Sequence, residues 1–149
     1  MTKLLIATHG YLADGYISTI KVIMGEEVSN KIDSLNLFVE DQESENVNSV
    51  IDNYFRNIRE EEIVIVFTDI MHGSVNQAII PYINENTFLI TGINLPLICE
   101  LVSTALFMDE NIEYDRVVEI INQSKNEIKF VNKILKEREQ ENTEDIFFE

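Results

Sequence analysis

Short apolar runs alternate with stretches of helical periodicity along most of the chain. The two most continuous runs, 4–8 and 63–67, predict buried strands, because a strand covered on both faces carries apolar residues at nearly every position. Residues 35–39 mostly alternate between apolar and polar, with Phe38 as the exception, and predict a half-exposed strand nearer the sheet edge. A fourth run, 88–90, completes a set of four predicted strands.

Helical periodicity separates these strands. In 47–58, apolar side chains recur at intervals of three and four residues, which places them on one face of a helix. Similar patterns predict helices over 12–24, 75–83 and 98–105, and a long helical pattern from 117 to 135, in which the polar stretch 123–127 is a candidate interruption. Strands that alternate with helices are typical of βαβ units. We therefore predict an α/β fold, a three-layer α/β/α sandwich around a mostly parallel sheet in the order 2-1-3-4.

Composition narrows the class of protein. The 149 residues fit one domain, which we expect to span 1–135, with 136–149 as a charged C-terminal tail, partly ordered at a dimer interface. Twenty-seven acidic and 11 basic residues give a formal net charge of −16, which argues against nucleic acid and anionic membranes as partners. Cys99 is the one cysteine, so the sequence predicts no disulfide framework, and we expect neither a metal nor a cofactor. No apolar stretch approaches the ~20 residues that cross a bilayer, and we expect a cytoplasmic protein.

The predicted sheet order indicates where a site should lie. Ligands of such sheets bind beyond the carboxyl ends of the strands, where neighbouring connections leave to opposite faces, here between the first and third strands. Those strands end in Thr8-His9-Gly10 and Thr68-Asp69. We therefore expect His9 and Asp69 to meet there as the catalytic pair. A neutral imidazole is a good nucleophile toward phosphorus, and a carboxylate on its other nitrogen fixes the tautomer.

Groups able to hold a phosphoryl group surround this pair. Gly73, Ser74 and Val75 begin a predicted helix, so their amides and the Ser74 hydroxyl can bind phosphoryl oxygens at the positive end of its dipole. Thr8 and Gly10 are the candidates at the first helix. Taken alone, His9 at a strand end is more often structural, Asp69 is more often a cap or turn residue, and Ser74 is more often an N-cap. Their joint placement at this point makes a functional site as good an interpretation as a structural one.

Three motifs in this order resemble the IIA family of mannose/fructose/sorbose phosphotransferase systems. They are Thr8-His9-Gly10, the loop Asp69-Ile70-Met71-His72-Gly73-Ser74, and Gly92-Ile93-Asn94-Leu95-Pro96. The resemblance covers residues 1 to about 130. It implies that His9 takes a phosphoryl group from the carrier protein HPr and passes it to a IIB component, in a system with IIC and IID membrane subunits. It also implies that Asp69 pairs with the His9 ring and that Ser74 helps to hold the phosphoryl group.

The resemblance further implies a homodimer that exchanges an antiparallel C-terminal strand, for which 128–135 and Asp145–Phe148 are the candidates. Two departures from the family pattern bear on the phosphate loop. His72 stands where the family usually has a glycine, and Val75-Asn76 replaces the S-P-x-N form of many members. His72 is either a second acid/base or an ordinary loop residue, and we favour the loop.

Three other interpretations stay open. A response-regulator receiver has an aspartate after its third strand, but it needs an acidic pair after the first strand to bind magnesium, where this chain has Thr8-His9. The phosphocarrier domain that serves dihydroxyacetone kinase also uses a histidine after its first strand, although the 92–96 motif and the 69–74 loop favour the sugar IIA family. A purely regulatory module with the same fold predicts no phosphate on His9.

Overall fold

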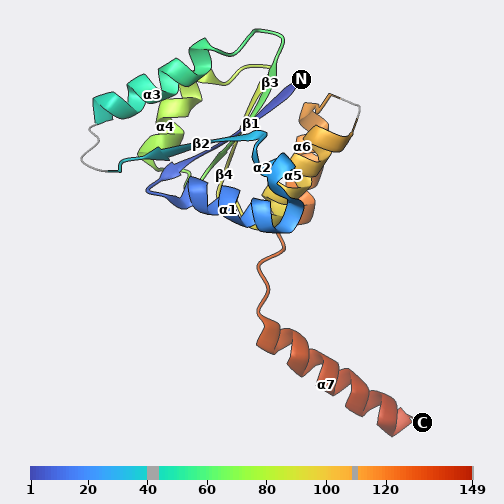
Figure 1. Ribbon diagram of the computed structural model, residues 1–149. Helices are drawn as coiled ribbons and strands as arrows, with labels where there is room; N and C mark the ends of the chain where they lie inside the picture. Colours follow the sequence, from blue (N-terminus) through green and yellow to red (C-terminus); the bar gives the residue numbers. More distant parts are fainter. Residues whose placement is uncertain (40–43, 109–110, 149) are drawn as a thin grey trace.

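The computed structural model describes residues 1–39, 44–108 and 111–148. The elements in chain order are β1 (Thr2–His9), α1 (Leu12–Met24), α2 (Glu26–Ser29), β2 (Ile32–Leu37), α3 (Ser44–Arg56), β3 (Ile63–Thr68), α4 (Ser74–Ile79), the 3₁₀ helix η1 (Ile80–Tyr82), β4 (Thr87–Thr91), α5 (Leu95–Phe107), α6 (Tyr114–Ser124) and α7 (Val131–Phe148). The four strands form one parallel sheet in the order β2-β1-β3-β4 (Figure 1), which confirms the predicted topology.

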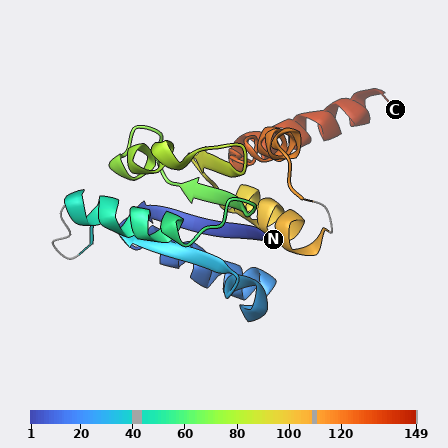
Figure 2. The ribbon, with the colours of Figure 1, turned by 90° about the horizontal axis from the view of Figure 1, so that it is seen from above.

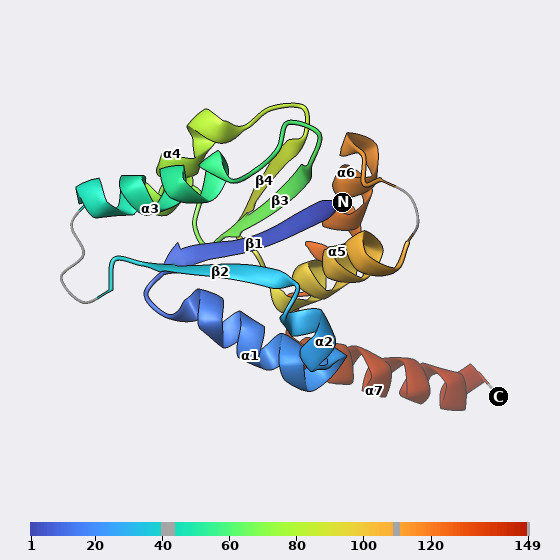
Figure 3. The same ribbon diagram turned by 45° about the horizontal axis from the view of Figure 1, so that its top comes forward.

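Helices cover both faces of this sheet, as predicted for a three-layer fold. The helices α1, α5 and α6 pack on one face, and α3 and α4 pack on the other (Figure 3). Successive residues of a strand point to opposite faces. In β1, Leu4 and Ile6 therefore enter the first apolar cluster while Leu5 and Ala7 enter the second, and all four are fully buried. This burial on both faces explains the unbroken apolar run that marks the strand in the sequence.

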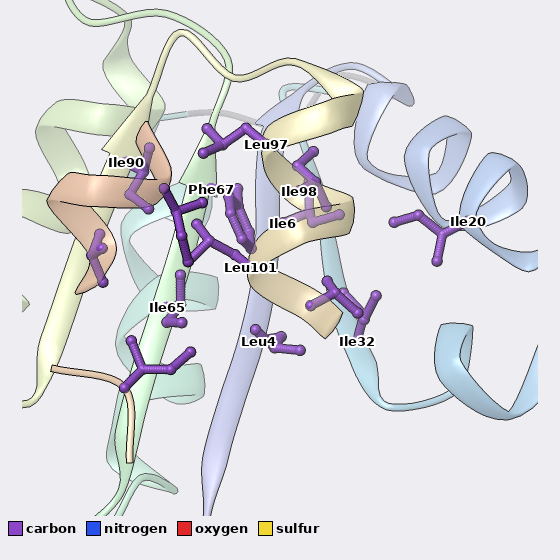
Figure 4. Packing of buried hydrophobic residues seen from close by; sticks show 14 of the residues in the cluster. Leu4, Ile6, Ile20, Ile32, Ile65, Phe67, Ile90, Leu97, Ile98 and Leu101 are labelled. Carbon is purple, nitrogen blue, oxygen red and sulfur yellow. The ribbon is translucent and has the colours of Figure 1, made fainter. Parts of the chain in front are cut away.

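The core under α5 holds the two central strands in place. Ile6 of β1 and Phe67 of β3 are fully buried against Ile98 and Leu101 of α5 (Figure 4). At 20–33 cal/mol for each Å² of apolar surface removed from water, burying one such side chain contributes about 1.5–3 kcal/mol. The carboxyl ends of β1 and β3 are thus anchored by fully buried apolar side chains.

Two boundaries differ from the sequence prediction. The second strand runs over Ile32–Leu37 rather than 35–39, so Phe38 lies just beyond it. The helical pattern predicted over 117–135 is divided into two helices, since α6 ends at Ser124 and α7 begins at Val131, and the break overlaps the polar stretch that the sequence indicated. The polar stretch between them separates the two helices.

The C-terminal segment is helical. The exchanged strand expected at 128–135 or Asp145–Phe148 is not found as a strand, because 131–148 form α7 and 127–130 have no regular structure. Figure 1 and Figure 2 both show the end of α7 apart from the packed layers. Across residues 131–146 every side chain except that of Ile134 is exposed. No helix within the described residues is long and apolar enough to span a membrane.

Candidate functional site

The structure brings His9 and Asp69 together at the carboxyl edge of the sheet. His9 is the last residue of β1, and Asp69 directly follows β3, the strand beside it. Adjacent parallel strands end at the same edge of a sheet, so their last side chains meet there. The His9 Nδ1 atom lies 2.8 Å from Asp69 Oδ2, and the His9 backbone N–H donates to the same oxygen over 3.0 Å.

Asp69 is held as a charged acceptor. Its side chain is 14% exposed, and its Oδ1 atom accepts the backbone N–H of Ile70 over 3.1 Å. Burial raises the pKa of Asp69, but the hydrogen bonds from the His9 backbone and ring outweigh this effect, and the pKa lies below its ordinary value. A carboxylate charged at neutral pH accepts the Nδ1 proton of the imidazole. The lone pair then lies on Nε2, the ring nitrogen that Asp69 does not contact.

The open side of the imidazole faces the loop before α4. Ser74 Oγ lies 3.3 Å from His9 Nε2 and is exposed. Gly73 packs against the ring edge, where a Cβ atom on residue 73 would lie 2.8 Å from His9 Cε1 and 2.8 Å from Ile70 Cγ1. A side chain at this position would therefore force the imidazole or the Ile70 side chain to move.

A buried amide sets the shape of this loop. Asn76 is 2% exposed, accepts a hydrogen bond from Thr68 Oγ1 over 2.8 Å, and donates to the Met71 carbonyl over 3.0 Å. It therefore connects the end of β3 to the middle of the loop that carries Asp69 and Ser74. In the sequence, Asn76 stands out only as part of Val75-Asn76, a departure from a family pattern. Its position two residues after Ser74 gives no periodic signal from which this role can be deduced.

The remaining candidate residues make contacts elsewhere or lie apart from the His9–Asp69 pair. Thr8 is fully buried, and its hydroxyl accepts the Ala13 N–H over 2.8 Å, so it supports the start of α1. The Gly10 N–H donates to the Leu37 carbonyl over 2.8 Å and is therefore already used. The Val75 side chain is fully buried, which leaves only its backbone near the site. His72 is exposed and, within the described structure, does not join the cluster of His9, Asp69 and Ser74.

Two aromatic residues lie near the pair although no motif pointed to them. The Phe38 ring stacks on the His9 ring, with centroids 5.4 Å apart and planes inclined by 17°. Burial raises the pKa of Tyr16 on α1, and the charge of Asp69 raises it further. In residues 1–39, 44–108 and 111–148, no group of three or more His, Cys, Asp or Glu side chains is placed to hold a metal ion.

Comparison with known families agrees with this geometry. The sequence model of a family described as the PTS system fructose IIA component, EIIA-man, matches residues 3–121. The chain belongs to this family. It is therefore a IIA-type component of a sugar phosphotransferase system (PTS), and the resemblance drawn from its three motifs is confirmed.

Solved structures of PTS proteins share the fold of this IIA chain. The PTS IIA protein associated with the fucose utilization operon of Streptococcus pneumoniae is 26% identical, with a TM-score of 0.74 over 90% of this chain and 96% of that one. A Klebsiella pneumoniae structure described as a phosphoenolpyruvate-dependent sugar PTS permease is 24% identical, with a TM-score of 0.78 over 90% and 93%. The EIIA component of Streptococcus agalactiae is 21% identical, with a TM-score of 0.71 over 89% and 99%. No curated protein sequence matches the chain.

Proposed function

We propose that this protein is a phosphocarrier that accepts a phosphoryl group from HPr on His9 and passes it to a IIB component during sugar uptake. One arrangement supports the proposal above all others. The imidazole is held at Nδ1 by a charged carboxylate 2.8 Å away, while Nε2 faces the exposed Ser74 hydroxyl at 3.3 Å. A histidine so arranged is a prepared nucleophile with a fixed tautomer.

The first transfer follows from these contacts. The lone pair on His9 Nε2 attacks the phosphorus in line as the nitrogen–phosphorus bond of the donor breaks and its electron pair returns to the donor ring. His9 gains positive charge, which Asp69 balances through Nδ1–H. The Ser74 hydroxyl and the first amides of α4, which have no partners inside the helix, donate to the phosphoryl oxygens. Transfer to the IIB component reverses the same steps with a second partner.

Apolar residues around the ring form a docking surface for both partners. Tyr11 and Leu12 follow β1 and are 58% and 47% exposed, while Ile70 and Met71 follow β3 and are 57% and 54% exposed. Exposed large side chains gathered next to a reactive atom are typical of a contact surface for another protein. The net charge of −16 favours partners that present basic residues around an apolar centre.

We further propose that the protein is a homodimer joined along β4. This strand lies at the edge of the sheet, beside a groove of about 700 Å³ that α6 closes on its other side. Residues 127–130, just before α7, have no regular structure and include two exposed apolar side chains. Ile128 is 87% exposed and Phe130 is 70% exposed. Addition of this segment from a second copy to the edge of β4 satisfies the open backbone groups of both. Ile128→Asp is expected to shift the protein to a monomer in analytical ultracentrifugation, and an unchanged mass refutes this contact.

Phosphorylation with phosphoenolpyruvate, enzyme I and HPr tests the phosphocarrier proposal. We expect an acid-labile, alkali-stable phosphate that maps to the peptide containing His9 and moves to a IIB component when one is added. His9→Ala is expected to take no phosphate while keeping the wild-type circular dichroism spectrum. His72→Ala, an exposed histidine on the neighbouring loop, is the matched control and should accept phosphate normally.

The same experiment separates the other interpretations. Phosphate on Asp69 that depends on magnesium indicates a receiver, and transfer to a dihydroxyacetone kinase subunit in place of a IIB component indicates the related carrier. A wild-type protein that takes no phosphate from HPr refutes the proposal and favours a regulatory module.

A further inference from the structure

Phe38 lies against the face of the His9 ring although it belongs to none of the three motifs. The two rings are nearly parallel, inclined by 17°, with centroids 5.4 Å apart. Phe38 directly follows β2, in the one position where the alternation of that predicted strand fails. The side chain is half-buried, so it is neither an ordinary core residue nor a fully solvated one.

The backbone at Phe38 is unusual. Its φ angle is +59°, and among the described residues it is the one non-glycine residue with positive φ. This left-handed conformation places Cβ too close to the backbone for most L-residues and costs free energy. Such strain persists where the surrounding structure enforces it, and it gathers at functional sites.

The end of β2 is attached directly to the residue after His9. β1 and β2 pair in parallel up to His9 and Leu37, and the Gly10 N–H then donates to the Leu37 carbonyl over 2.8 Å. Leu37 is itself buried, at 1% exposed. The start of the turn at Phe38 is therefore fixed relative to the imidazole, and the positive φ sets the direction in which its ring leaves the chain.

We propose that Phe38 is a positioning residue that fixes the plane of the His9 imidazole. Asp69 holds the ring at Nδ1, and the space beside Cε1 has no room for a Cβ atom on residue 73, whereas Phe38 stacks on the ring face. Contact on the ring face restrains rotation about the remaining side-chain torsion, which otherwise moves Nε2 away from Ser74 and the incoming phosphorus. The π-face of Phe38 also attracts the positive charge that the imidazole gains on phosphorylation. The effect on transfer, though not the restraint itself, presupposes the proposed phosphocarrier function.

Two measurements on Phe38→Ala test this role. The nitrogen-15 shifts of the His9 ring report its tautomer and need no phosphoryl donor. In the wild type we expect a protonated Nδ1 and an unprotonated Nε2. In the Phe38→Ala variant, we expect the two nitrogen-15 shifts to move toward the average of the two tautomers. The transfer rate at saturating HPr should fall about two- to tenfold, the range spanned by one aromatic stack, with little change in KM. Phe38→Tyr, which keeps an aromatic face, should restore both signals.

Two further variants separate positioning from folding and docking. Phe38→Gly suits the positive φ and removes the ring, so it should fold at least as well as Phe38→Ala and share its loss of rate. Phe107→Ala removes an exposed phenylalanine at the far end of α5 and should change neither signal. Wild-type shifts and rates in Phe38→Ala and Phe38→Gly overturn the proposal, and so does a change confined to KM. If the wild type accepts no phosphate from HPr, the phosphocarrier proposal fails while the nitrogen-15 shifts still decide whether Phe38 restrains the ring.

Discussion

Replacing Asp69 by asparagine removes the charge next to His9 with almost no change in shape. In the wild type, Asp69 Oδ2 accepts both the His9 backbone N–H and the ring Nδ1–H, and Oδ1 accepts the Ile70 N–H. An asparagine has one carbonyl oxygen to offer. If that oxygen takes the place of Oδ2, the amide NH₂ group faces the Ile70 N–H, and a donor then points at a donor.

The magnitude follows from the bond to the ring. A hydrogen bond to a charged group contributes about 1.5–3 kcal/mol, against about 0.5–1.5 kcal/mol for a neutral one. In the proposed transfer, the bond from Nδ1 to Asp69 strengthens as His9 becomes positive, so Asp69→Asn loses the charge-assisted part of this bond from the transition state. The difference between the charged and the neutral bond is about 1–1.5 kcal/mol, and with a factor of ten for each 1.36 kcal/mol this loss lowers the transfer rate by about 5- to 13-fold.

Rapid-quench transfer from radiolabelled phospho-HPr measures this loss. Asp69→Asn should lower the rate at saturating HPr and leave the affinity for HPr, measured by calorimetry, close to that of the wild type. Asp115→Asn, on the exposed first turn of α6, is the matched control and should transfer at the wild-type rate. A wild-type rate in Asp69→Asn refutes the electrostatic role of this carboxylate.

Three more predictions concern the loop, the charge and the core. Gly73→Ala should lower the transfer rate at least tenfold with the fold intact, because its Cβ would lie 2.8 Å from His9 Cε1. The pKa of Asp69 is lowered on folding, so its charge stabilises the protein above the unfolded value of about 3.9, and this contribution is lost as pH falls through the lower folded value. The stability difference between wild type and Asp69→Asn in urea should therefore be constant near neutral pH and shrink below about pH 4. Phe67→Ala, at a fully buried site, should destabilise the domain by about 3–5 kcal/mol in denaturant titration.

Controls and opposing outcomes are available for each. Gly15→Ala adds a Cβ into open space within α1 and should leave transfer unchanged. Normal transfer by Gly73→Ala shows that the ring and loop can separate without loss. A stability difference that does not change with acidity rules out a lowered pKa for Asp69. A loss well under 1 kcal/mol for Phe67→Ala contradicts the packing between β3 and α5.

The sheet and the meeting of its two central strands could be predicted from sequence because they depend on local patterns. Unbroken apolar runs at 4–8 and 63–67 mark strands buried on both faces, and burial on both faces places them in the centre. Once β1 and β3 are neighbours, the residues at their ends are brought together by the geometry of parallel strands. The proximity of His9 and Asp69 therefore follows from the order of the strands alone.

The hydrogen-bond partners of individual polar groups could not be predicted in the same way. Thr8 and Gly10 have the right chemistry for a phosphate site, but Ala13 and Leu37 use their groups, and this depends on where α1 and β2 come to lie. Phe38 did leave a signal, since it interrupts the alternation of its strand. That break shows that the strand ends there, but it does not show which side chain the displaced ring meets.

The groups that surround the His9 ring restrict the two proposed transfer steps to one ring atom. Asp69 contacts Nδ1, Gly73 lies beside Cε1 and Phe38 covers one face, so in the proposed phosphocarrier the phosphoryl group enters and leaves through Nε2. HPr and the IIB component then cannot bind at that atom at the same time. An excess of unphosphorylated HPr, or of phosphorylated IIB component, occupies the site and excludes the other protein. Flux through the pathway should peak at a balanced ratio of the two proteins and fall when either is overproduced.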